Sequence, residues 1–254
     1  MRNLINMLGA VSKNASINLK DFRAALGYCP VCMAKTPLIK LKNSEMSIRC
    51  LCCRSSAVTM SLVSVLHSIV KDLRTKDVYE MSSRGPLCKY LENNSKRLTV
   101  SEFFDQVPPG AYYNSIQCQD VQKLTYPDQS FDICTSTEVF EHVPDDLKGF
   151  SEIFRTLRPG GWFIFTVPLH DIEKTVERAK IAPDGSIEHI LPPEYHVDPL
   201  RQHDSTLVFR DYGLDIVQRL TSRGFCKAEI IHPGDCIPWG FGRKVVAGRK
   251  SDYG

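Results

Sequence analysis

The stretch Asp77-Val-Tyr-Glu-Met-Ser-Ser-Arg-Gly85 begins as a short strand-like run, continues through a polar loop and ends in a glycine that opens a helix-like segment at residues 85–91. It starts an alternation of strands and helices. Further strand-like runs lie at residues 97–101, 115–119, 131–137 and 161–168, and a helix is predicted at 145–157. Strands that alternate with helices predict an α/β fold with a parallel sheet. In such a sheet, ligands bind beyond the carboxyl ends of the strands.

Turn residues interrupt this alternation beyond residue 168. They are Pro183, Asp184-Gly185, Pro192-Pro193 and Pro199. A long irregular segment within a compact domain usually carries function, so residues 169–207 are predicted to form an insertion loop, or lid, over the mouth of the pocket. His196 near Asp198 could act there as an oriented general base. The same residues also fit an ordinary solvated lid.

The end of the chain restores the alternation. Residues 210–220 carry a helical stripe, and residues 226–231 and 244–247 are predicted to be closing strands of a seven-stranded sheet. Trp239 and Phe241, in the turn between these strands, are expected to shield a hydrophobic edge.

Four cysteines near the start of the chain, Cys29, Cys32, Cys50 and Cys53, form two Cys-x-x-Cys hooks. Two such hooks can aim four thiolates at one point and complete the tetrahedral shell that zinc prefers. Structural zinc contributes roughly 10–16 kcal/mol to the folding of small peptides, so it can hold a segment that has little core. Cys52 is an alternative to Cys53, although the regular spacing favours Cys53. Unliganded thiols or a redox pair on the first hook are the other interpretations.

The chain is predicted to contain an N-terminal segment with a zinc ribbon at residues 1–56, a connecting helix at 57–76 and a catalytic domain at 77–254. The connecting helix carries one apolar stripe, made of Val58, Leu62, Val65, Leu66, Ile69 and Leu73, which is expected to dock the ribbon on the larger domain.

The charge and the N-terminal sequence bound the function classes. A net charge of +3 and a pI near 8.3 fall short of the pI above about 9 that marks a nucleic-acid surface, so RNA is not favoured as a partner. Residues 1–11 fit neither a secretory signal nor a membrane span. We therefore predict a cytoplasmic location, with the cysteines outside the hooks reduced.

Four stretches resemble the class I S-adenosylmethionine-dependent methyltransferases. Residues 77–85 resemble the first strand and cofactor loop of that family, and Leu98-Thr-Val-Ser-Glu102 resembles its second strand with a terminal acid. Residues 118–132 resemble the run from the third strand into the fourth. Glu138-Val-Phe-Glu-His-Val-Pro144, followed by residues 152–161, resembles the helix and turn before the fifth strand. The resemblance implies a Rossmann-like seven-stranded sheet and S-adenosylmethionine as cofactor.

The resemblance also implies roles for residues at the strand ends. Glu102 would accept hydrogen bonds from the ribose hydroxyls, as the acid after a Rossmann glycine loop does. Asp120 would contact the adenine amino group and the Val121 backbone would lie beside the ring. A turn-capping role is the alternative for Asp120.

The first loop is implied to hold the methionine end of the cofactor. Glu80 would complement its positive charges, with a plain ion pair at the strand end as the alternative. Ser82 and Gly85 would line the loop, but Ser82, Ser83 and Arg84 stand where the family has glycines that let the backbone approach the cofactor. This departure leaves a non-catalytic scaffold as one alternative function.

His142 is implied to face the pocket, where its ordinary pKa near 6.5 suits a general base; ordering the loop is its alternative role. We predict an enzyme that transfers a methyl group to an oxygen or nitrogen acceptor, with a small molecule or a glycan favoured. An RNA or protein methyltransferase that uses the ribbon for substrate binding is a further alternative.

Overall fold

The computed structural model describes residues 20–43, 47–197, 205–234, 239 and 242–253. Its centre is a six-stranded sheet in the order β16-β17-β9-β8-β4-β5. The strands are β4 (Asp77–Glu80), β5 (Arg97–Val100), β8 (Phe131–Thr137), β9 (Leu157–Thr166), β16 (Lys227–Ile231) and β17 (Val245–Arg249). The first four are parallel, whereas β17 runs antiparallel to β9 and β16 antiparallel to β17. The predicted α/β class with a Rossmann-like, mostly parallel sheet is confirmed.

A single parallel bridge between Glu102 and Cys118 occupies the place of the seventh strand, beyond β5. The sequence predicted a full strand at residues 115–119. Instead, β7 (Ile116–Gln117) pairs with β6 (Tyr112–Tyr113) as a small hairpin, which leaves only Cys118 to extend the sheet.

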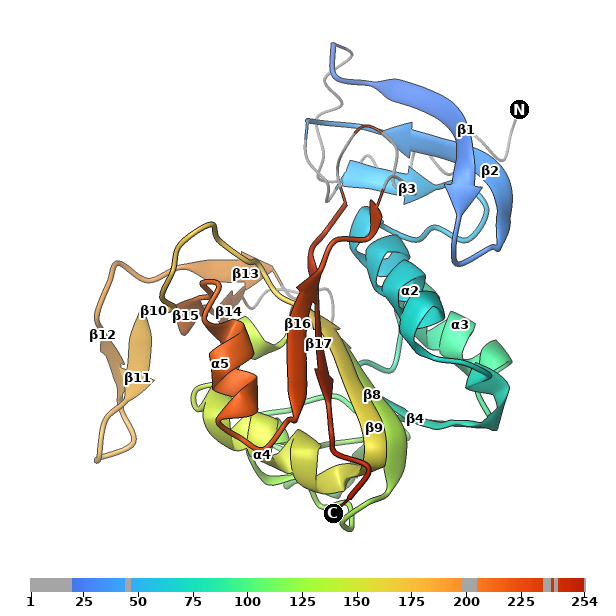
Figure 1. Cartoon of the computed structure of the whole chain (residues 1–254). Helices are drawn as coiled ribbons and strands as arrows, with labels where there is room; N and C mark the ends of the chain where they lie inside the picture. The colour runs from blue at the N-terminus through green and yellow to red at the C-terminus, as the bar shows by residue number, and fades with distance from the viewer. Residues whose placement is uncertain (1–19, 44–46, 198–204, 235–238, 240–241, 254) are drawn as a thin grey trace.

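Helices cover both faces of the sheet (Figure 1). On one face lie α2 (Ala57–Ile69) and α3 (Gly85–Asn94), and on the other α4 (Asp146–Thr156) and α5 (Ile216–Thr221). Successive side chains of β9 point to opposite faces, so Phe163 and Phe165 pack with the α4 and α5 side while Ile164 packs with the α2 and α3 side. This two-sided burial explains why β9 is so strongly apolar.

The cysteine hooks lie on a separate three-stranded antiparallel sheet, made of β1 (Arg23–Cys29), β2 (Ala34–Lys40) and β3 (Ile48–Cys50). Its small core, which includes Leu38 and Ile48, is shared with Ala57 and Met60 from the first turns of α2. Trp239 packs against the same core, as expected for a residue that shields a hydrophobic edge, while Phe241 lies outside the described residues. The later turns of α2 pack on the central sheet, so this helix joins the two parts. The 3-10 helix η2 (Leu73–Thr75) follows it.

The turn at Arg158-Pro-Gly-Gly161 lies inside β9, whereas the sequence predicted that the strand begins after it. Phe131 pairs with Leu157 and Ile133 with Trp162, so the intervening residues form an irregularity in the strand. Arg158 is held there by ion pairs with Asp77 and Asp132, both 3.0 Å long. These distant partners make the turn part of the sheet.

The helix predicted at residues 210–220 is wrong in extent, since only α5 is helical. Tyr212 instead forms a bridge with Leu169, and its hydroxyl donates to Asp146 over 2.9 Å. Tyr212, Ile216 and Leu220 are all buried, so the apolar stripe was a true core signal with the wrong local structure.

The predicted lid loop contains short strands rather than irregular chain. They are β10 (Val176–Glu177), β11 (Ala179–Ile181), β12 (Ile187–His189), β13 (Tyr195–Val197) and β14 (Ser205–Leu207), and β15 (Arg210–Asp211) follows just after the lid. They pair as β10 with β15, β11 with β12 and β13 with β14. Among the described residues, no helix is both long enough and apolar enough to cross a bilayer.

Candidate functional site

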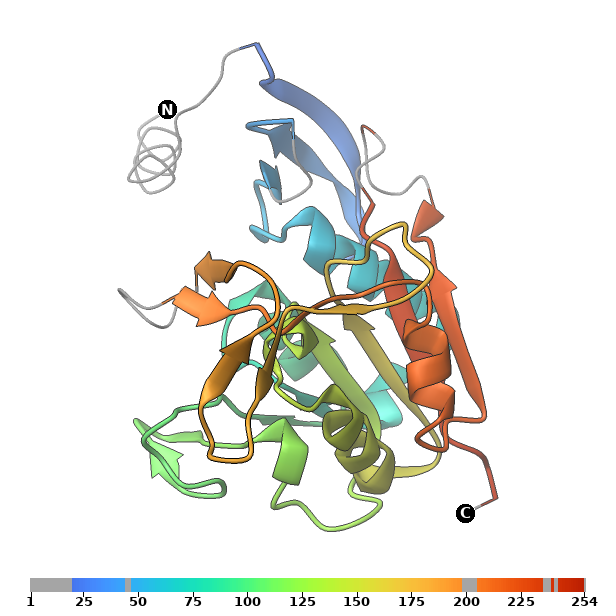
Figure 2. The same cartoon turned by 90° about the vertical axis from the view of Figure 1, so that its left-hand side faces the viewer.

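A cavity of about 1250 Å³ opens at the carboxyl ends of β4, β5 and β8. The lid contributes to its wall through Ile181, Ile187, Tyr195, His196, Thr206 and Leu207, and the lid strands face the viewer in Figure 2. The predicted site residues on its wall are Ser82, Gly85, Glu102, Asp120, Val121, His142 and His196. The cavity therefore brings together residues from the first loop, two strand ends and the lid, as the parallel sheet requires.

Glu102 is buried at this wall and is held by the first loop. Its Oε1 accepts hydrogen bonds from the Ser83 amide over 2.7 Å, from Ser83 Oγ over 2.9 Å and from Ser82 Oγ over 3.3 Å. Bonds from neutral donors to a carboxylate are stronger than those between two neutral groups. The two serines that stand where glycines were expected therefore hold the Glu102 carboxylate in place.

Gly85 begins α3 with φ +92°, and a Cβ built on it would meet nothing within 4 Å. Glycine is favoured there for its backbone angle and leaves open space beside the helix start. Arg84, also on the cavity wall, is exposed.

Asp120 caps the 3-10 helix η3 (Val121–Lys123), and its Oδ1 accepts from the Gln122 amide over 2.9 Å. Asp120 therefore has the turn-capping geometry of the alternative interpretation. Asp120 and Val121 also line the cavity.

Glu80 does not lie on the cavity wall. Its carboxylate is 1% exposed and accepts a hydrogen bond from Thr135 Oγ1. Burial, together with the nearby charge of Glu102, raises the pKa of Glu80 from 4.5 to about 8. Direct contact between Glu80 and a cofactor would require this side chain to turn, because it is hydrogen-bonded to Thr135 on β8.

His142 ends the 3-10 helix η4 (Phe140–His142), which follows β8. Its Nδ1 lies 2.8 Å from the Leu207 carbonyl. A carbonyl can only accept, so Nδ1 carries the proton and Nε2 is the basic nitrogen of the neutral ring. The ring packs edge-on against His196, with 5.0 Å between centroids. Asp198, the predicted partner of His196, lies outside the described residues.

Glu141 is the carboxylate next to these histidines. Its Oε1 is 3.7 Å from His142 Nε2 and 3.8 Å from His196 Nδ1. Burial, reinforced by the charge of Glu138, raises the pKa of Glu141 well above its usual range.

Sequence reasoning missed Arg243, which lines the cavity and pairs with Glu138. Glu138 directly follows β8 with φ +53°, and its side chain accepts a hydrogen bond from this arginine. The two residues are 105 positions apart, so no local pattern could have revealed the pair.

The four hook cysteines meet in the ribbon, with their Sγ atoms all within 4.8 Å of one another. Cys29 lies 3.7 Å from Cys53 and Cys32 lies 3.8 Å from Cys50, whereas Cys52 is exposed outside the cluster. Burial opposes ionisation of Cys50, but a hydrogen bond with Thr36 and backbone amides outweigh it and lower its pKa to about 7. Four converging sulfur atoms fit a tetrahedral zinc ion.

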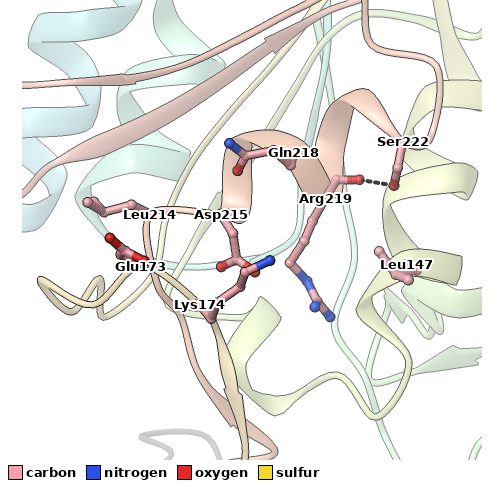
Figure 3. Close-up of a pocket in the computed structure, with 8 residues that line it drawn as sticks. All are labelled: Leu147, Glu173, Lys174, Leu214, Asp215, Gln218, Arg219 and Ser222. Atoms are coloured by element: carbon pink, nitrogen blue, oxygen red, sulfur yellow. Dashed lines mark hydrogen bonds between the residues drawn. The ribbon is translucent and has the colours of Figure 1, made fainter.

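A second hollow, of about 520 Å³, lies between α4, α5 and residues 173–174 (Figure 3). Its side chains include Asp215 and Arg219, and none of the predicted site residues lies there.

Residues 79–165 match the family model described as "Methyltransferase domain". This segment is a methyltransferase domain, as its resemblance to the S-adenosylmethionine-dependent methyltransferases implied. The match spans β4 to β9 and includes Glu102, Asp120 and His142.

Curated relatives match over short stretches. A ubiquinone biosynthesis O-methyltransferase of Coxiella burnetii is 42% identical over 50 residues, which are 20% of this chain and 21% of the relative. A sterol 24-C-methyltransferase of Gibberella zeae is 34% identical over 89 residues, 35% of this chain and 18% of the relative. The chain thus spans about a fifth of the length of these relatives. A solved S-adenosylmethionine-dependent methyltransferase from Mesorhizobium loti aligns with a TM-score of 0.48 and 15% identity, covering 75% of this chain and 98% of that one.

Proposed function

We propose that this chain transfers a methyl group from S-adenosylmethionine to an oxygen or nitrogen acceptor, with a small molecule or a glycan as the favoured acceptor. One observation carries the proposal: the carboxylate that follows β5 shares a single cavity with the lid and with His142. The methyltransferase-domain match over residues 79–165 supports it.

The residues of the cavity fit the cofactor. Glu102 follows β5 and would accept hydrogen bonds from the ribose hydroxyls. Gly85 leaves open space at the start of α3, and Asp120 and Val121 line the next stretch of wall. When bound, S-adenosylmethionine would supply an electrophilic methyl group. The chain itself would orient the acceptor, exclude water through the lid and remove a proton where the acceptor must lose one.

His142 and His196 are the proposed proton acceptors. The Leu207 carbonyl fixes the His142 ring with Nε2 unprotonated, and both histidines line the cavity. A base must reach the proton that it removes, and the position of both imidazoles on the cavity wall supports this role.

The size of the cavity favours a small acceptor. Ligand pockets usually measure about 300–1000 Å³, so about 1250 Å³ leaves room for a cofactor and a modest acceptor together. The RNA alternative would have to use the exposed basic side chains of the three-stranded sheet and its turns, Lys35, Lys42 and Arg54.

The test is binding followed by transfer. Calorimetry with S-adenosylhomocysteine should give heat with the wild type, and Glu102→Gln should weaken affinity at least about 10-fold, because a hydrogen bond to a charged group contributes roughly 1.5–3 kcal/mol. Glu92→Gln, on the exposed side of α3, is the matched control. Labelled methyl donor and cell extract, followed by mass spectrometry, would then identify the acceptor. No heat at millimolar ligand would overturn the proposal and favour the scaffold.

A further inference from the structure

The cluster of Glu141, His142 and His196 has the composition and spacing of a metal site. One ligand atom from each residue lies within 4.8 Å of the other two. Glu141 and His142 come from the loop after β8, whereas His196 comes from the lid strand β13. The fold therefore closes the lid onto this loop with two imidazoles and a carboxylate.

The carboxylate of Glu141 is the strongest indication. Its side chain is 1% exposed, and neither oxygen accepts a hydrogen bond from another residue that the structure describes. An ionised carboxylate without partners is costly to bury, and proteins normally pair such a group or place it on a metal. Here its Oε1 instead faces the two imidazole nitrogens at 3.7 and 3.8 Å.

From this arrangement we propose that Glu141, His142 and His196 bind a divalent transition-metal ion, with Zn²⁺ as the best fit. Zinc–nitrogen and zinc–oxygen bonds of about 2.0–2.2 Å with tetrahedral angles place ligand atoms roughly 3.3–3.6 Å apart. The observed oxygen-to-nitrogen separations exceed that range by only a few tenths of an ångström. Two imidazoles and one carboxylate are also a known ligand set of open, catalytic zinc sites.

The second nitrogen of each imidazole faces an acceptor, which is hydrogen-bonded to His142 and lies slightly beyond hydrogen-bond distance from His196. His142 Nδ1 donates to the Leu207 carbonyl over 2.8 Å, so Nε2 is the nitrogen that faces Glu141. His196 Nε2 lies 3.7 Å from Glu194, and Arg178 holds Glu194 at 3.2 Å. Metal-bound histidines almost always direct their other nitrogen to a carbonyl, carboxylate or water, which fixes the tautomer and the ring.

The bound ion would connect the lid to the methyltransferase domain. Because His142 and His196 line the cavity, the remaining coordination position would face it and accept water or an acceptor oxygen. The ion would occupy the nitrogens proposed above as proton acceptors, and it would itself lower the pKa of that oxygen. Metal binding does not depend on methyl transfer, so the two proposals can fail separately.

The test counts zinc in the full chain after equilibration with zinc and gel filtration. With the ribbon occupied, the wild type should hold two ions per chain, whereas Glu141→Gln and His196→Ala should each hold one. His189→Ala, on the exposed lid strand β12, should keep two. Cys32→Ser should lose the other ion, which assigns each loss to its own site.

Hydrogen exchange supplies a second readout. Zinc should slow exchange of the amides at residues 195–197 in the wild type but not in His196→Ala, a partly exposed position where a fold defect is not expected. A wild type that holds no ion beyond that lost in Cys32→Ser would overturn the proposal. So would a second ion that both Glu141→Gln and His196→Ala retain.

Discussion

Ser83 donates both its backbone amide and its hydroxyl to the same oxygen of Glu102, over 2.7 and 2.9 Å. The loop that departs from the glycine-rich pattern is therefore bonded directly to the acid proposed to hold the ribose. This contact orients the carboxylate before a ligand arrives, and a preorganised group loses less entropy on binding.

Ser83→Ala should weaken binding of S-adenosylhomocysteine about 3- to 10-fold, because one hydrogen bond that orients Glu102 is lost and the amide remains. Titration calorimetry measures the change. Ser222→Ala, exposed at the end of α5, should leave affinity unchanged. Unaltered binding in Ser83→Ala would show that the hydroxyl does not position the acid.

His142→Asn should lower the rate of methyl transfer by about 10²–10⁴-fold while cofactor affinity changes little, since Glu102 and the first loop remain intact. Single-turnover kinetics beside calorimetry separates the two quantities. A variant that loses affinity as much as Glu102→Gln does would assign His142 to cofactor binding instead.

Glu80 should make stability depend on pH. Its pKa is about 8 in the folded chain and near 4.5 when unfolded, so the folded state retains a proton that the unfolded state has released. Stability should therefore fall as pH rises from about 4.5 to 8, with a penalty of about 1.4 kcal/mol for each unit of pKa difference. Urea denaturation across this range should show a smaller decline in Glu80→Gln than in the wild type. Equal slopes would contradict the prediction.

Arg210→Met should destabilise the fold by about 2–5 kcal/mol, because the buried carbonyls that accept hydrogen bonds from its guanidinium would lose their donor, at roughly 1–3 kcal/mol each. Arg210 is 2% exposed, lies 3.1 Å from Glu177 and donates to the Val143 and Pro144 carbonyls over 2.6 and 2.7 Å. Chemical denaturation measures the loss, and Arg223→Met, an exposed position, should shift stability by less than about 0.5 kcal/mol.

Cys32→Ser should release the zinc proposed for the ribbon and unfold residues 23–50 locally, because a structural zinc site supplies most of the stability of a small module. Cys52→Ser should retain both metal and fold, since Cys52 lies outside the cluster. Zinc analysis with limited proteolysis distinguishes them. Metal loss in Cys52→Ser alone would mean that the hook uses the other cysteine.

Local sequence patterns predicted the strands and helices whose buried positions are set by their own residues. The strand expected at residues 131–137 is β8 to the residue, because its aromatic and β-branched residues, Phe131, Ile133, Thr135 and Thr137, alternate along a short segment that follows a turn. Arg158 shows the opposite case. Its turn is part of β9 because Asp77 and Asp132 form ion pairs with its guanidinium. Partners so distant in the sequence produce no local pattern from which the contact could be predicted.

The sequence alone determined the order of strands and helices, the cysteine hooks and the acid after the second strand of the sheet, because each depends on spacing within a short segment. Tertiary structure alone decided that Glu141 meets His196, that Glu138 pairs with Arg243 and that Glu80 turns toward Thr135 instead of the cavity. These contacts join elements that only the closed sheet and its lid bring together. The burial that raises the pKa values of Glu80 and Glu141 exists only in the folded state.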